Sequence, residues 1–408
     1  MMGSRGLLLL LLSLLFVACD RDPVVLTVKP DVVEKGDTAR KTLLVYMMAE
    51  NSLSKYAALD VAEIVEAVPS VPNDCRLFVY TDDIGFPILT QYFNMTDGSV
   101  GNSNYHPFDK DVCSSDTAAL GKLLDFILKD YPTESLDIVM WSHGNGWLRD
   151  PSNSAPQRSI GIDNDCNSYS NNVTVSIEVE ELAALLKRLP TRVDRLMFDA
   201  CFMQCAEVAY ALRDATEWVI ASPAEIPGDG ALYSTMVPEF FLSDGPEGII
   251  DSYIKAYENE YAGAVLSAVR TSGMQHLADV TYAYVIKYFN TDKTREYSAL
   301  FSYLPGGGGD GNGVIYPYYY DMNSVMKRYL DAEEYKHWRS ALDGAVTYLS
   351  ASTTWYSAIR GRKLWFDVES GSGISVYMPQ RRSMNESLNA NFRTTEWYSA
   401  AGWQAAGW

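Results

Sequence analysis

Two apolar runs in the sequence end abruptly in residues that can carry out nucleophilic chemistry. The run 136–141 leads into Ser-His-Gly at His143, and the run 196–198 leads into Asp-Ala-Cys, which ends at Cys201. Short apolar runs of this kind predict buried strands of a parallel sheet. Because the functional ends of such strands meet at one edge of the sheet, we expect His143 and Cys201 to lie close together.

A cysteine beside a histidine can perform acyl transfer. A free thiol has a pKa of about 8.5, so a neighbouring imidazole favours its reactive thiolate. The same imidazole can protonate a leaving amine. Gly144 has no side chain, which lets its backbone N–H approach a developing oxyanion. Taken singly, such a cysteine is more often a small buried hydrophobe and such a histidine a cap residue, and it is their joint placement that favours catalysis.

The surrounding elements alternate between strand and helix through the first half of the chain. This pattern predicts an α/β fold, with a mostly parallel sheet covered by helices on both faces. The predicted strands are 42–50, 75–83, 136–141, 195–199, 217–222 and, near the end, 373–379, with a hairpin arm at 88–93. The predicted helices are 53–68, 116–129 with Asp116 as N-cap, 178–189, 204–215, 245–261, 276–289, 322–330 and 334–350.

Composition narrows the possible functions. The chain has 408 residues and a net charge of -19, which argues against nucleic-acid binding. Apart from Cys19 it has five cysteines, too few for a disulfide framework, and their odd number predicts at least one free thiol. None of its four histidines has zinc-ligand spacing, so we expect no metal centre.

The N-terminus is predicted to be a targeting segment. Arg5 precedes an apolar run at 7–17 that is too short to span a membrane, and a small residue stands before Cys19. This arrangement resembles the lipobox of bacterial lipoproteins, although Phe16 replaces the usual Leu. We expect export and lipidation of Cys19 in the cell envelope; the alternative is an ordinary secretory signal.

The predicted organisation has four parts. Residues 1–18 form a signal peptide and 19–40 a tether. Residues 41–380 form one catalytic domain, and 381–408 are a C-terminal extension. The glycine-rich stretch 306–313 has no lysine after it, so we interpret it as a surface loop and not a phosphate-binding loop.

The two motifs together resemble the clostripain family of cysteine peptidases, which shares a clan with caspases, legumain and gingipains. The resemblance rests on His-Gly at 143–144, Asp-x-Cys at 199–201, the block ASPAEIPGDG at 221–230 and GISVYMP at 373–379. It implies a caspase-like α/β/α sandwich, with His143 as general acid/base and Cys201 as nucleophile.

The resemblance also implies cleavage after arginine and, more weakly, lysine. A buried guanidinium must be paired with a carboxylate, and Asp199 and Asp229 are the acids placed to provide one. Relatives can be activated by cleavage in the loop that corresponds to 148–174, where we expect a cut at Arg158. No cofactor is expected to be required. Relatives can depend on calcium, but the run Asp163-Asn164-Asp165 is equally compatible with a plain turn.

Two alternatives to a cysteine peptidase are considered. A lipase or esterase would need a Gly-x-Ser-x-Gly elbow, which the sequence lacks. A non-catalytic surface lipoprotein on a peptidase-like scaffold stays open, since 27 tyrosines and nine tryptophans would suit a binding surface. Labelling of Cys201 by a peptidyl electrophile separates this alternative from a peptidase, whose partners would be proteins or peptides containing Arg or Lys.

Overall fold

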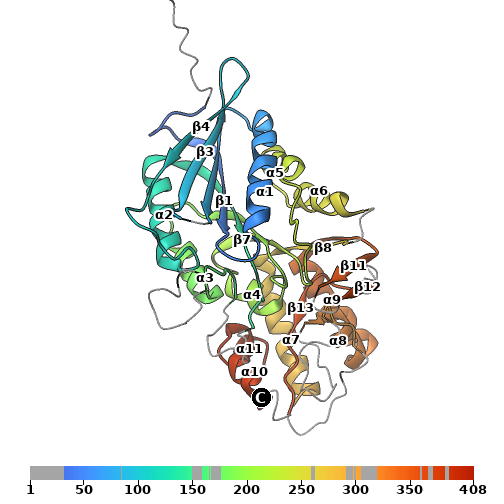
Figure 1. The fold of residues 1–408 in the computed structure, drawn as a ribbon. Coiled ribbons are helices and arrows are strands. Elements are labelled where there is room, and N and C mark those ends of the chain that lie inside the picture. Colours follow the sequence, from blue (N-terminus) through green and yellow to red (C-terminus); the bar gives the residue numbers. More distant parts are fainter. Residues whose placement is uncertain are drawn as a thin grey trace, which may run out of the picture.

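The central feature is a nine-stranded sheet in the order β10-β8-β7-β6-β5-β1-β2-β3-β4 (Figure 1). The computed structural model describes residues 32–83, 85–148, 159–164, 166, 176–258, 262–290, 297, 300–304, 319–358, 361–365, 371–381 and 386–408. The five central strands are parallel: β1 (Ala39–Met48), β2 (Cys75–Asp82), β5 (Thr133–Trp141), β6 (Val193–Asp199) and β7 (Thr216–Ala221). The antiparallel edges are β3 (Ile88–Asn94) and β4 (Val100–Tyr105) on one side and β8 (Val265–Arg270) and β10 (Val346–Ala351) on the other.

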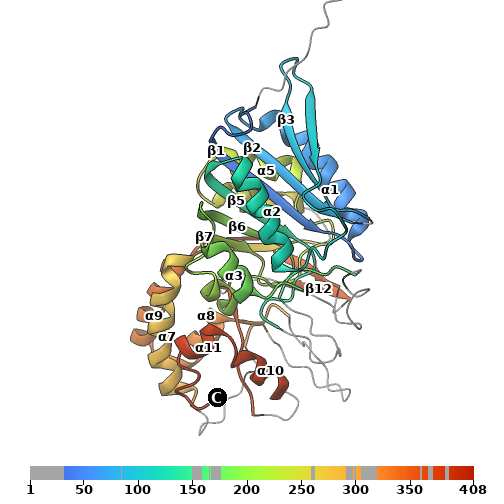
Figure 2. The same cartoon turned by 90° about the vertical axis from the view of Figure 1, so that its left-hand side faces the viewer.

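Helices cover both faces of this sheet, which confirms the predicted α/β/α sandwich (Figures 1 and 2). One face carries α1 (Ser54–Ala67), α5 (Tyr233–Leu242) and α6 (Glu247–Tyr257). The other carries α2 (Thr117–Asp130), α3 (Val179–Lys187), α4 (Ala206–Ala211) and α7 (Met274–Tyr288). Along β1, alternate residues enter the two cores, which explains why a central strand reads as an unbroken apolar run.

The remaining helices and strands follow α7 in the sequence. They are α8 (Met322–Tyr329), α9 (Ala332–Ala345), α10 (Glu386–Phe392) and α11 (Glu396–Ala400), with the small pairs β11 (Thr354–Ser357) with β12 (Arg362–Trp365) and β9 (Tyr320–Asp321) with β13 (Ser375–Val376). The C-terminal segment packs on the core through buried aromatic rings at Phe392, Trp397 and Trp403. None of the described helices is long and apolar enough to cross a membrane.

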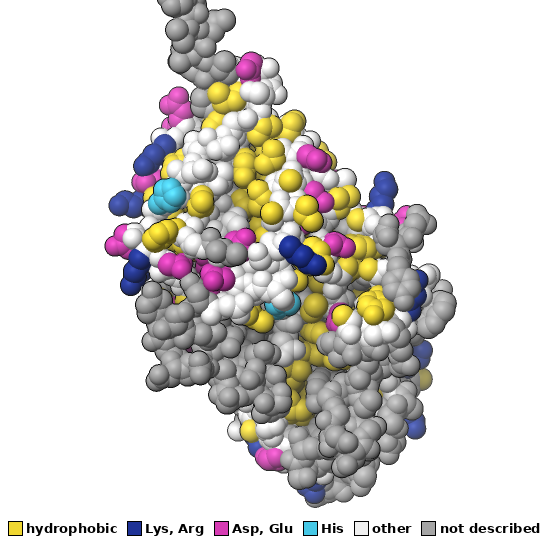
Figure 3. All heavy atoms as spheres, viewed as in Figure 1, with side chains coloured by type: hydrophobic (Ala, Val, Ile, Leu, Met, Phe, Trp, Pro, Cys, Tyr) yellow, Lys and Arg dark blue, Asp and Glu magenta, His cyan; other side chains and the backbone are white. Residues whose placement is uncertain are grey.

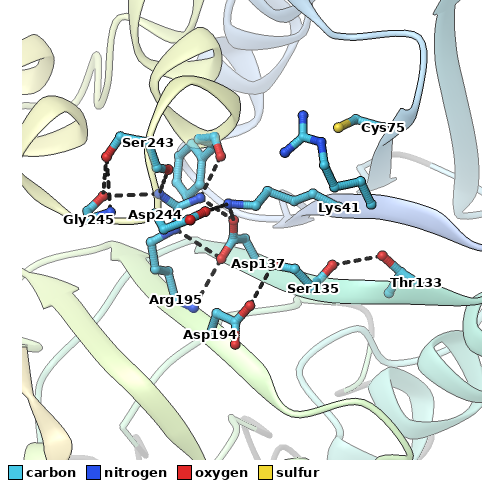
Figure 4. A network of polar contacts seen from close by, with 12 residues as sticks. Lys41, Cys75, Thr133, Ser135, Asp137, Asp194, Arg195, Ser243, Asp244 and Gly245 are labelled. Carbon is cyan, nitrogen blue, oxygen red and sulfur yellow. Dashed lines mark hydrogen bonds and ion pairs between the residues drawn. The ribbon is translucent and has the colours of Figure 1, made fainter.

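Buried charges hold the amino ends of the central strands together (Figure 4). Arg195 on β6 donates from Nε to Oδ1 of Asp137 on β5 at 3.0 Å, and both side chains are fully buried. Arg195 also donates to the carbonyls of Ser243 and Gly245. The buried amine of Lys41 lies 3.8 Å from Asp137 and 3.0 Å from the exposed Asp244. The network therefore fastens the α5–α6 connection to the sheet edge opposite His143.

Several predicted elements need correction. The helix predicted at 334–350 ends at Ala345, and β10 follows, because Val346 to Ala351 pair with β8 at the edge of the sheet. The strand predicted at 373–379 is only the two-residue β13, which pairs with β9 outside the main sheet. Helix α5 and strands β4 and β8 were not predicted. The predicted cap is confirmed, since Asp116 accepts a hydrogen bond from Ala118 N at 2.9 Å.

Candidate active site

A cavity of about 590 Å³ lies where β5, β6 and β7 end. Its lining comes from the ends of these strands, from the start of α1 and from the segment that follows the 148–158 stretch. The lining residues used below are His143, Gly144, Cys201, Asp199, Glu225 and Gly161. The structure thus brings His143, Gly144, Cys201 and Asp199 together around one space, as the strand-end argument predicts.

His143 follows β5 and is partly buried. Its Nε2 lies 2.9 Å from Ser52 Oγ, in a hydrogen bond that fixes the ring from the side of the β1–α1 connection. Burial lowers the pKa of His143, so the ring is neutral at pH 7. If Ser52 accepts the Nε2 proton, Nδ1 carries the lone pair of the ring and can act as a base.

Cys201 lies two residues beyond the end of β6, not on the strand itself. It sits in a turn in which Phe202 has a φ of 62°, a left-handed conformation that is uncommon for a bulky residue. Its sulfur accepts a weak hydrogen bond from Ile226 N at 3.4 Å. Burial, followed by the carboxylates of Glu225 and Asp199, raises the pKa of Cys201 to about 12. In this structure burial thus favours the neutral form of both the thiol and the imidazole.

Gly144 packs directly against the turn that carries Cys201. A Cβ atom at this position would lie 2.7 Å from the carbonyl oxygen of Cys201 and 2.8 Å from the Cβ of Ala200. Only glycine permits this close approach, because no side-chain carbon tolerates such distances. The backbone of residue 144 is therefore held against the segment on which an acyl group would form.

Asp199 closes one end of the cavity and is held by three donors. Its Oδ2 accepts from Ala231 N at 3.1 Å and from Tyr233 Oη at 2.9 Å, and its Oδ1 accepts from Tyr253 Oη at 3.2 Å. Burial raises the pKa of Asp199, and these three hydrogen bonds act in the opposite direction. The carboxyl group is consequently fixed in orientation and still faces the cavity.

A second buried acid, Asp60 on α1, lies near Asp199. Its Oδ2 accepts from Trp141 Nε1 at 2.8 Å. Burial and then the charge of Asp199 raise the pKa of Asp60 to about 8. Asp60 itself does not line the cavity, but the two buried acids each disfavour ionisation of the other.

Asp229, the other acid predicted for substrate binding, has an exposed side chain in the turn 228–230. Gly228 and Gly230 on either side of it line the cavity, whereas Asp229 is not among the lining residues. Its charge still reaches this region, since it contributes to raising the pKa of Asp60. The structure places Asp229 at the rim and Asp199 inside.

Sequence reasoning did not identify Ser52, Asp60 or Glu225. Glu225 lines the cavity and accepts a hydrogen bond from Ser357 on β11, which lies 132 positions away. Ser52 carried a usable signal, because it follows β1 at the same sheet edge as His143. The sequence gives no such signal for Asp60 and Glu225, because their positions near the cavity depend on which segments fold over the edge of the sheet.

Two predicted sites, Cys19 and Arg158, lie outside the described residues, as does most of the loop 148–174. Within the described part of that loop, Cys166 forms a disulfide with Cys113. Cys75, Cys201 and Cys205 are free thiols. The disulfide ties the segment that carries Gly161 to the connection before α2, and so fixes one wall of the cavity.

Comparisons with known proteins point to one family of peptidases. The sequence profile of the clostripain family, peptidase C11, matches residues 45–408. Clostripain from Hathewaya histolytica is 27% identical over an alignment of 256 positions, which covers 57% of this chain and 48% of that protein. The chain thus spans about half the length of this relative.

Solved structures match over most of the chain. A secreted C11 cysteine protease from Bacteroides thetaiotaomicron, bound to an irreversible peptide inhibitor, has a TM-score of 0.76 and 27% identity, with 90% of this chain and all of that chain covered. An inactive zymogen of a C11 protease from Parabacteroides distasonis has a TM-score of 0.73 and 28% identity, with 91% and 99% covered.

Proposed function

Because this chain belongs to the clostripain family of cysteine peptidases, we propose that it hydrolyses peptide bonds after basic residues, with Cys201 as nucleophile and His143 as general acid/base. The observation that supports this proposal is the single cavity lined by His143, Gly144, Cys201 and Asp199.

The reaction begins with the neutral pair described above. The Sγ of Cys201 attacks the carbonyl carbon while its proton passes to His143, so that charge develops only as the C–S bond forms. The imidazolium then protonates the leaving amine as the C–N bond breaks. Water, deprotonated by His143, hydrolyses the resulting thioester and restores the thiol. The N–H of Gly144 stabilises the oxyanion in both steps.

The preference for arginine follows from the charge at the end of the cavity. A guanidinium that leaves water needs a carboxylate partner, and Asp199 has that role in this proposal. The neighbouring Asp60 would gain from the same cation, since its pKa is raised by burial and by Asp199. The net charge of -19 would draw basic substrates toward the protein, and the face in Figure 3 carries acidic side chains spread among basic ones, with a small group of them at its left.

Cleavage of peptides with and without a basic residue tests the proposal. The wild-type protein should cleave after arginine, less well after lysine and barely after leucine. Cys201→Ala and His143→Ala should each abolish cleavage while the protein keeps its cooperative thermal unfolding. Wild-type rates in Cys201→Ala would remove Cys201 as the nucleophile. A folded protein that neither cleaves peptides nor reacts with a peptidyl electrophile at Cys201 would favour the binding-lipoprotein alternative.

Activation and location are further parts of the proposal. A zymogen among the similar structures supports activation by cleavage in the loop 148–174, and we infer Arg158 as the site. N-terminal sequencing of the active protein should show a new terminus at Ser159, which Cys201→Ala should lack. A similar protein described as secreted supports export, and we infer lipidation of Cys19. Cys19→Ser should leave membranes, and an unmodified mature N-terminus would contradict the anchor.

A further inference from the structure

A second, much smaller cavity of about 10 Å³ lies between the start of α3, helix α4 and the turn that leads into α11 (Figure 1). Its lining includes three acidic residues, Glu178, Glu180 and Glu207, together with Trp147 and Ser159. A cavity of this volume has room for one water-sized group. Because Ser159 follows Arg158, the cut that we propose for activation would create an α-amino group on a residue that lines this cavity.

Glu207 is the most deeply buried acid of this cavity. The residue is 2% exposed, and its Oε1 accepts a hydrogen bond from Tyr377 N at 2.9 Å. Its Oε2 is buried and receives no hydrogen bond from the described residues. Burial raises the pKa of Glu207 to about 7, and the Tyr377 hydrogen bond and the nearby thiol of Cys205 oppose this shift only in part. A cation that reaches Oε2 would therefore stabilise the carboxylate.

An ammonium group suits this position better than a larger cation. It is about the size of a water molecule, it has three N–H donors, and an α-amino group with a pKa of about 7.7–8.0 is mostly protonated at pH 7. None of the ion pairs between described residues includes Glu207. A proton on Glu207 and a bound water molecule are the alternatives, but both would act equally in the uncut and the cut chain.

The position of Ser159 is tied to the segment that carries the catalytic histidine. The carbonyl oxygen of Ser159 accepts from Asn145 N at 3.0 Å, and Gly161 N donates to the carbonyl oxygen of His143 at 3.0 Å. Residues 159–161 thus pair with the chain on either side of Gly144. After the cut these residues would begin at a free chain end, so a bond at that end would keep the pairing in place.

We propose that Glu207 binds the α-ammonium group of Ser159 in the processed protein, and that this ion pair holds residues 159–161 against His143. In the uncut chain the nitrogen of Ser159 is an amide, which has no charge and only one N–H. The charge that Glu207 needs appears only when the peptide bond after Arg158 is cut. This inference rests on the proposed activation by cleavage at Arg158, and Glu207 would act on catalysis only by positioning.

Reactivity of the new α-amino group tests the binding without any peptidase activity. In the full chain carrying Cys201→Ala, the recognition sequence of a site-specific protease replaces residues 153–158, so that an added protease exposes Ser159. N-terminal sequencing verifies the new terminus. At pH 8 its amine should be acetylated at least tenfold more slowly than that of a free peptide beginning Ser-Ile-Gly, because pairing with a carboxylate keeps it protonated. Glu207→Gln should restore the rate of the peptide.

Thermal unfolding of the same proteins gives a second measurement. In the uncut chain Glu207→Gln should leave Tm unchanged or raise it, because glutamine can still accept from Tyr377 N and a buried acid is removed. In the cut chain the same substitution should lower Tm by about 5 °C, because a buried ion pair is lost. Glu181→Gln, at an exposed position on α3, is the matched control and should change neither the Tm nor the acetylation rate.

The effect on catalysis is measured in the processed active protein. Glu207→Gln should lower kcat at least threefold and change KM little, because the ion pair supports the segment beside His143. An unchanged kcat would overturn this positioning role.

Other results would overturn the binding itself. An α-amino group that reacts as fast as that of the free peptide would do so. Equal changes of Tm in the cut and uncut chains would also do so, and would assign to Glu207 a proton or water molecule that is present in both. A wild-type protein that is active without a terminus at Ser159 would instead overturn the proposed cut, whatever the chain with the added recognition sequence shows.

Discussion

Replacing Asp199 by asparagine should convert a preference for arginine into near indifference to charge. The change suits this position because asparagine can preserve the surrounding hydrogen bonds. Its side-chain oxygen can still accept from Ala231 N and Tyr233 Oη, and its amide can donate to Tyr253, whose hydroxyl rotates to accept. The substitution therefore removes a negative charge and little else.

The magnitude follows from the burial of Asp199, which is 3% exposed. Loss of one partner from a buried, hydrogen-bonded charge pair costs about 2–5 kcal/mol. At about 1.36 kcal/mol for each factor of ten, kcat/KM for an arginine substrate should fall about 30-fold to several-thousand-fold. Cleavage of a substrate with an uncharged side chain before the scissile bond should not fall, because that side chain has no charge to pair with Asp199.

The assay compares two peptides that differ only in arginine or citrulline before the scissile bond. Citrulline has nearly the shape of arginine without its charge, so the ratio of the two kcat/KM values isolates the contribution of the carboxylate. Asp229→Asn, at the exposed rim position, is the control and should change this ratio by less than about threefold. If Asp199→Asn remains active and keeps the wild-type ratio, Asp199 does not bind the cationic side chain.

Three further predictions concern the protonation, stability and geometry of the molecule. The pKa of Asp60 is raised to about 8, so the stability that its protonated form contributes is present below about pH 4 and is lost as pH rises through 8. Asp60→Asn cannot lose this stability at high pH. The variant should therefore have a higher Tm than the wild type at pH 9 and nearly the same Tm at pH 4. Asp137→Asn should lower the free energy of unfolding by about 3–5 kcal/mol in urea titrations, because it breaks a buried ion pair, whereas Asp244→Asn at the exposed end of the same network should cost about 0–1 kcal/mol. Ser52→Ala should lower kcat about fivefold by releasing the ring of His143, and Ser52→Thr should restore it; equal kcat in all three proteins would show that the 2.9 Å contact has no positioning role.

The central sheet was predictable because each parallel strand is buried on both faces and so appears as a compact apolar run. The edges were harder. Val346 to Ala351 continue directly from α9, and only their pairing with β8 makes them a strand. Helix α5 contains Pro238, which is normally a helix-ending signal, and its apolar residues do not stand at clear helical spacing.

The residues of the candidate site also fall into a predictable and an unpredictable group. His143 and Cys201 could be paired from sequence because both follow strands of one parallel sheet, and the topology of such sheets brings those ends together. The tyrosines that hold Asp199 come from α5 and α6, which follow it much later in the chain. Nothing in the sequence around these tyrosines indicates that they contact Asp199.

The disulfide between Cys113 and Cys166 determines what an activated molecule would look like on a gel. Cys113 precedes Arg158 in the chain and Cys166 follows it, so the bond bridges any cut made between them. A processed protein should run as one full-length band without reductant and as two shorter bands with it. A single band under non-reducing conditions is therefore no evidence against processing, and the two chains of a processed molecule would remain covalently joined.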